Sequence, residues 1–155
     1  MRSVLVPVDG SECSDRAVQE VIATVEKSGP LEIHVINVQP PIFSEPSLIY
    51  LPQDKLDTFY FDQGERGLAS AQKLLKDAGL AFTVHRAVGP IADTIIAKAH
   101  GLGADSIVMG THGRGKISEM LLGSVCLKVL HLSDIPVTVV RSRLKPDLGG
   151  RIGIA

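Results

Sequence analysis

The sequence predicts one α/β domain built on an open, parallel, five-stranded sheet with helices on both faces. Apolar runs rich in β-branched residues alternate along the chain with segments of helical periodicity, as right-handed β-α-β crossovers require. The chain has 155 residues, of which 45% are hydrophobic and 21% charged, so one packed core is expected.

Five apolar runs are the predicted strands. The continuous runs VLV at 4–6 and IVM at 107–109 are typical of central strands that are covered on both faces. The third run contains His85 and Arg86, so we expect it at an edge of the sheet. The fifth run is apolar, and at an edge it would need a cover from the tail or from a second subunit. The strands are expected at Ser3–Val8, Glu32–Val38, Phe82–Val88, Ser106–Met109 and Pro136–Val140.

The segments between these runs carry apolar residues at helical spacing. Ser11 is placed to cap the first helix. Pro90 is expected at the first position of the third helix, and Gly101 at its end. The fourth helix is expected to begin near Ser124 and to turn Leu132 inward. The first two helices are expected before Gly29 and at about Asp54–Asp77.

Charge balance and hydropathy argue against two classes of partner. With 16 basic and 17 acidic residues and a net charge of -1, the chain has no broad positive field for nucleic acid. No apolar run approaches the roughly 18 residues that span a bilayer, and Pro7 and Asp9 interrupt the first run too early for a signal peptide. Cys13 and Cys126 form no CxxC pair, so we expect reduced thiols and a cytoplasmic protein.

The segment Gln39–Gln53 is irregular and carries prolines at 40, 41, 46 and 52. It follows the carboxyl end of a strand, where open α/β sheets bind ligands. Long irregular segments are often functional, so a role in binding is one interpretation. A variable surface excursion is an equally good one.

A glycine-rich segment from Gly110 to Ser124 joins the fourth strand to the fourth helix. Glycine lets a backbone approach an anion closely, and successive N–H groups can then point at one phosphate. A helix that begins at Ser124 adds unpaired N–H groups and a positive dipole end. This composition fits a phosphate site, and it fits equally well a structural loop whose turns each need a glycine.

Two known phosphate motifs match this segment only in part. Residues 110–116 read GxxxxGK, but Ile117 follows, so the hydroxyl with which a P-loop holds Mg²⁺ is missing. The predicted helix also begins only beyond Gly123, whereas a P-loop opens its helix at once. The dinucleotide fingerprint needs three glycines, and Gly113 and Gly115 supply two.

The spacing G-x2-G-x9-G-S, at Gly110, Gly113, Gly123 and Ser124, resembles the nucleotide motif of the universal stress protein family. The segments VLVPVDGSECSDRAV and SDIPVTVVR are similar to that family's first and last strands, so the resemblance covers residues 1 to about 141. It implies an adenine nucleotide alpha hydrolase-like fold with strand order 3-2-1-4-5, a family domain at 1–141 and a C-terminal tail at 142–155. The family has ATP-binding members with this motif and members without it, and this chain resembles the first kind.

The resemblance places an adenine nucleotide (ATP, or AMP or ADP) where the first and fourth strands diverge. The Asp9 carboxylate would accept from a ribose hydroxyl, and it is the candidate ligand for a Mg²⁺ or Mn²⁺ carried in by the triphosphate. Val38 would flank adenine through its backbone, and His112 or Arg114 could reach a phosphate. This chain departs from the family at Cys126, where many members carry a polar residue. The full set of nucleotide-binding residues that the resemblance implies is Pro7, Val8, Asp9, Val38, Met109, Gly110, His112, Gly113, Arg114, Gly123, Ser124 and Val125.

The resemblance thus implies an ATP-binding regulatory module in stress response, and the apolar edge at residues 136–140 predicts that it works as a homodimer. No residue stands out as a general base for water, and Ser124 has no histidine and carboxylate at recognisable spacing, so we expect at most slow ATP hydrolysis. A slow ATP hydrolase and an interaction scaffold without nucleotide remain alternatives. No protein-built metal site is expected, because the sequence has no HxH or HxxxH spacing of metal ligands among the histidines His34, His85, His100 and His131.

Overall fold

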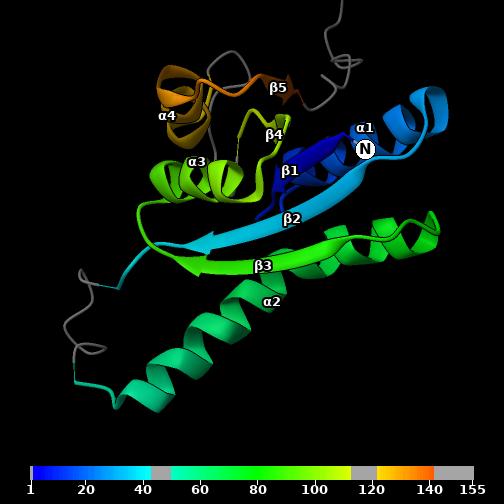
Figure 1. The fold of residues 1–155 in the computed structure, drawn as a ribbon. Coiled ribbons are helices and arrows are strands. Elements are labelled where there is room, and N and C mark those ends of the chain that lie inside the picture. The colour runs from blue at the N-terminus through cyan, green and yellow to red at the C-terminus, as the bar shows by residue number, and fades with distance from the viewer. Residues whose placement is uncertain (1, 43–49, 113–121, 142–155) are drawn as a thin grey trace, which may run out of the picture.

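The computed structural model describes residues 2–42, 50–112 and 122–141. Their strands form one parallel sheet in the order β3-β2-β1-β4-β5, which confirms the predicted fold class and strand order (Figure 1). The elements are β1 (Ser3–Pro7), α1 (Glu12–Ser28), β2 (Glu32–Gln39), α2 (Gln53–Asp77), β3 (Thr83–Val88), α3 (Ile91–Leu102), β4 (Ser106–Gly110), α4 (Ser124–Leu132) and β5 (Val137–Val140).

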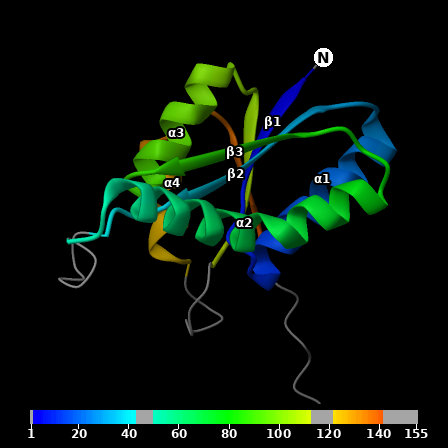
Figure 2. The same ribbon diagram turned by 90° about the horizontal axis from the view of Figure 1, so that it is seen from below.

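Helices cover both faces of the sheet. α1 and α2 lie on one face, and α3 and α4 lie on the other (Figures 1 and 2). Side chains of β1 alternate between the two faces, so Val4 and Val6 pack against α1 and α2 while Leu5 packs against α3 and α4. Every residue of β1 is buried, as expected for the central strand.

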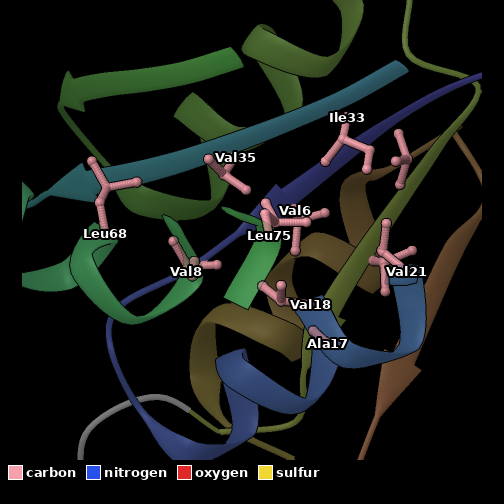
Figure 3. Close-up of a cluster of buried hydrophobic side chains, with 12 residues drawn as sticks. Val6, Val8, Ala17, Val18, Val21, Ile33, Val35, Leu68 and Leu75 are labelled. Carbon is pink, nitrogen blue, oxygen red and sulfur yellow. The ribbon is translucent and has the colours of Figure 1, made fainter. Parts of the chain in front are cut away.

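The core on the α1–α2 face consists of aliphatic side chains from three sheet strands and both helices (Figure 3). Val18 of α1 and Leu75 of α2 are fully buried against the strands. Burying one such side chain contributes about 1.5–3 kcal/mol to stability, so this layer holds the helices firmly on the sheet. The labelled members are Val6, Val8, Ala17, Val18, Val21, Ile33, Val35, Leu68 and Leu75.

The helix ends agree with the sequence at some points and differ at others. The side chain of Ser11 caps α1 by accepting from the Ser14 N–H at 3.2 Å, as predicted. Pro90 lies one position before α3, as its N-cap, because its ψ of 122° is not helical. The helix passes through Gly101 and ends at Gly103, whose φ of 62° is the left-handed conformation that terminates helices. Leu132 was predicted to face inward and is 46% exposed.

The order of the connections creates a switch point at one edge of the sheet. The chain leaves β1 toward the α1–α2 face and leaves β4 toward the α3–α4 face, although the two strands are paired neighbours. Their carboxyl ends therefore open away from each other, which is the switch point where open α/β sheets bind ligands. Among the described residues, no helix is long and apolar enough to cross a membrane.

Candidate functional site

A cavity of about 470 Å³ opens at the switch point, over the carboxyl ends of β1, β2 and β4. This volume is in the range of small-molecule sites. The two predicted residues Gly113 and Arg114 lie outside the described part of the chain. The other predicted residues all line the cavity: Pro7, Val8, Asp9, Val38, Met109, Gly110, His112, Gly123, Ser124 and Val125.

Asp9 is held in a tight turn between β1 and α1. Its Oδ1 accepts from the Ser11 N–H at 2.9 Å, and its own N–H donates to Ser14 Oγ at 3.4 Å. The strand ladder continues to the preceding residue, because the Val8 N–H donates to the Ile36 carbonyl at 2.9 Å. These bonds fix the Asp9 carboxylate at the cavity wall on the β1 side.

The amino end of α4 forms the opposite wall. Gly123 is the N-cap residue and its N–H donates to the Thr111 carbonyl at 2.7 Å, which ties the helix to the end of β4. Gly123 makes no side-chain cap, and the first turn contains no acidic residue. The N–H groups of Ser124, Val125 and Cys126 precede the first intrahelical bond, from the Leu127 N–H to the Gly123 carbonyl. This helix end therefore offers donors and a positive dipole end to an anion.

His112 brings a side-chain donor to the same wall. Its Nδ1 lies 3.0 Å from Thr111 Oγ1, and that hydroxyl lies 3.8 Å from Cys13 Sγ. When the threonine hydroxyl donates to Nδ1, the proton of the neutral ring is on Nε2. The buried Nε2 has no hydrogen-bond partner within the described residues. A phosphate oxygen in the cavity would satisfy it only after a movement that exposes Nε2 to the cavity.

Two glycines bring backbone close to this wall. A Cβ on Gly110 would lie 2.7 Å from the Cys13 carbonyl carbon, so the glycine lets α1 pack directly on the end of β4. A Cβ on Gly123 would lie 3.0 Å from the Thr111 carbonyl oxygen. Gly110 therefore has a packing role in addition to the binding role that the sequence indicated.

Several cavity residues were not predicted. Asn37 comes from the end of β2, Gln63 and Gly67 come from α2, and Thr111 directly follows β4. Gln39 and Pro40 also line the cavity; they begin the segment Gln39–Gln53, for which a role in binding was one interpretation and whose residues 43–49 lie outside the described part of the chain. Asn37 is buried within a strand that is otherwise mainly apolar, and that contrast was a usable signal. The α2 contribution could not be found from the sequence, because it depends on how the helix crosses the sheet.

Cys126 lines the cavity at the start of α4. Burial raises the pKa of its thiol, so the group is neutral and a weak donor at neutral pH. Across the described ranges, no group of three or more histidine, cysteine or acidic side chains could hold a metal ion.

The sheet order and the cavity at the switch point define a doubly wound α/β protein with a cavity of small-molecule size at the carboxyl edge of its sheet. The sequence pattern of the universal stress protein family matches residues 1–141. The chain therefore belongs to the universal stress protein family.

Individual relatives agree with this membership. Universal stress protein YxiE of Bacillus subtilis is 30% identical over 145 residues, which are 89% of this chain and 97% of that protein. The fold is similar to that of the hypothetical protein MJ0577, with a TM-score of 0.77, 26% identity, and coverage of 92% of this chain and 97% of the other. It is also similar to a universal stress protein in complex with cAMP, with a TM-score of 0.67, 26% identity and coverage of 92% and 98%.

Proposed function

We propose that this chain is an ATP-binding universal stress protein whose nucleotide occupancy regulates its action in stress response. The observation that carries the proposal is the convergence of the predicted residues from β1, β2, β4 and α4 on one cavity. A structural neighbour of 26% identity is described in complex with cAMP, an adenine nucleotide, which supports the same ligand class here.

The chemistry of the walls suits an extended nucleotide. The N–H groups at the start of α4 and His112 Nε2 would hold the phosphates, together with Gly113 and Arg114 of the glycine motif. The fixed Asp9 carboxylate would accept from a ribose hydroxyl and contact a Mg²⁺ or Mn²⁺ carried in by the triphosphate. Val38 would contact adenine from the end of β2.

Titration calorimetry with ATP tests this function directly. We expect saturable binding of one ATP per chain, and mass spectrometry of the purified protein should detect ATP or AMP as the co-purifying small molecule. An absence of both heat and co-purifying nucleotide would favour a scaffold without nucleotide. Phosphate release well above about 1 per second would instead favour an enzyme.

We further propose a homodimer through β5. This strand is at an edge of the sheet, and Val137 and Val139 are only half-buried there. The neighbouring α4 also carries exposed leucines, with Leu127 52%, Leu130 40% and Leu132 46% exposed. A second copy would cover this edge, as apolar edge strands require.

The proposed organisation is one functional domain at residues 1–141 followed by a tail at 142–155. The family pattern ends at the same residue, 141. A cytoplasmic setting fits the two cysteines, Cys13 and Cys126, which are both buried and unpaired by disulfide.

A further inference from the structure

The end of the cavity at β2 lies away from the wall that the amino end of α4 forms. In the sheet, β1 separates β2 from β4, so these strands are roughly 10 Å apart at ordinary strand spacing. A nucleotide with its phosphates at α4 would therefore bring its base to the β2 end. Gln39 and Pro40 of the β2 end and Gln63 of α2 line the cavity there.

A chain of two side-chain amides fixes the orientation of Gln39. Asn37 Nδ2 donates to the Val8 carbonyl at 2.9 Å, and a carbonyl can only accept, so the NH₂ end of the Asn37 amide must face Val8. Asn37 Oδ1 then faces the other way and accepts from Gln39 Nε2 at 2.7 Å. The main-chain carbonyl of Val8 thereby determines the orientation of both side-chain amides, that of Asn37 directly and that of Gln39 through Asn37.

The consequence is an unused acceptor on Gln39. Its NH₂ group is bonded to Asn37, and within the described residues its Oε1 makes no hydrogen bond. Gln39 is only half-buried, so Oε1 can be approached by a ligand. A carbonyl oxygen at this place is able to accept a hydrogen bond from an N–H donor of a ligand.

Helix α2 is adapted to the Asn37 amide. A Cβ on Gly67 would lie 2.3 Å from Asn37 Nδ2, so only glycine leaves room for the amide at this point. A Cβ on Gly64, one turn earlier, would lie 3.8 Å from Asn37 Oδ1. That distance is ordinary van der Waals contact, so only Gly67 is required by the amide. A glycine in a helix interior is unfavourable by about 1 kcal/mol relative to alanine, so α2 loses intrinsic stability at Gly67, where it accommodates this side chain.

We propose that Gln39 selects a 6-amino purine over a 6-oxo purine, with Asn37 as its positioning residue. The 6-amino group of adenine donates to Gln39 Oε1, whereas the 6-oxo group of hypoxanthine or guanine brings a second acceptor to the same oxygen. This inference rests on the proposed function, since it assumes a nucleotide in the cavity. It adds a side-chain basis for recognition of the base.

Calorimetry with AMP and IMP tests the assignment, because these nucleotides differ only at the purine 6-position and the adjoining ring nitrogen. The wild-type chain should bind AMP about 10-fold more tightly than IMP. The 6-amino group of AMP makes a hydrogen bond with Gln39 Oε1, whereas the 6-oxo group of IMP places two acceptors opposite each other. Gln39→Met, which keeps the side-chain length, should bring the two affinities within about 2-fold of each other. Gln19→Met makes the same change at an exposed site on α1 and should leave the preference intact.

Asn37→Asp tests the positioning role, because it replaces the donor to Val8 with an acceptor. The preference for AMP over IMP should fall, while the gain in affinity from AMP to ADP, which reports the phosphate wall, should stay unchanged. If this variant does not fold, Gln39→Met alone decides.

Three outcomes would overturn the inference. Equal binding of AMP and IMP by the wild type refutes base selection while leaving nucleotide binding in place. Retention of the preference by Gln39→Met, or its loss in Gln63→Met instead, refutes the assignment to Gln39. Absence of any binding of AMP, IMP or ATP by the wild type refutes the proposed function and this inference together.

Discussion

Replacing Gly123 by valine should weaken ATP binding without unfolding the protein. The backbone of Gly123, at φ -64° and ψ 157°, is allowed for valine, so no backbone strain arises. The new Cβ would lie 3.0 Å from the Thr111 carbonyl oxygen and 3.4 Å from the His112 Cα. The two additional methyl groups must then separate the start of α4 from the end of β4.

The magnitude follows from the donors at that helix end. Separation of the two segments misplaces at least one N–H group that would bond a phosphate, and a hydrogen bond to a charged group is worth about 1.5–3 kcal/mol. At 1.4 kcal/mol per tenfold, the affinity should fall about 10- to 100-fold. Gly123→Ala requires a shift of only a few tenths of an ångström and should have a smaller effect in the same direction.

Calorimetry with ATP is the assay, and Gly101→Val is the matched control. Gly101 lies within α3, and a Cβ there would meet no neighbouring element within 4 Å, so the same substitution is made at an open site. The control should bind ATP like the wild type, and circular dichroism should show that both variants are folded. Equal affinity in Gly123→Val and the wild type would refute the assignment of the phosphates to this wall.

Three further predictions concern the dimer and two titrating groups. Thr138→Lys, at an exposed position of β5, should convert a dimer to a monomer in light scattering. Thr83→Lys makes the same change on the other edge strand, β3, and should leave the dimer intact. If both variants remain dimers, β5 is not the dimer interface. The pKa of His85 is lowered from 6.5, first by burial and then by the charges of Lys98 and His34. Lys98→Met should therefore raise the pKa of His85 in an NMR titration, and an unchanged pKa would contradict the contribution of Lys98. Because the unfolded chain binds the proton more readily, His85 should also make stability fall as pH drops through 6.5. Burial raises the pKa of the Cys126 thiol, so iodoacetamide should modify Cys126 slowly at pH 7, and rapid modification there would contradict its burial.

The fold was predictable because local patterns and layer geometry agree. The continuous apolar runs at 4–6 and 107–109 are indeed buried in adjacent central strands, and the polar third run is an edge strand. Helix ends were less predictable. The third helix was predicted to end at Gly101, but the left-handed backbone that terminates it is at Gly103. Leu132 is exposed because no part of the described chain covers it, and the periodicity of apolar residues in the sequence does not show which of them are covered.

The candidate site was predictable where a motif or a strand end marks it. Asp9 and Gly123 were implied by the resemblance to the universal stress protein family, and both line the cavity. Asn37 was missed, and Gln39 was named only as the start of the segment Gln39–Gln53, because the importance of both side chains lies in a hydrogen-bond chain that begins at the Val8 carbonyl. Gly67 looks like an ordinary weak point of a helix until the approach of Asn37 explains it.

Titration of the ¹⁵N-labelled protein with ATP, followed by NMR, tests the central claim most directly. We predict that the largest amide shifts fall on Asp9, Ser124, Val125 and Cys126, the backbone groups at the two walls of the switch-point cavity. Residues on the outer edge of β3 should not move. A spectrum that ATP leaves unchanged, or shifts confined to residues away from the cavity, would contradict the claim that this cavity binds the nucleotide.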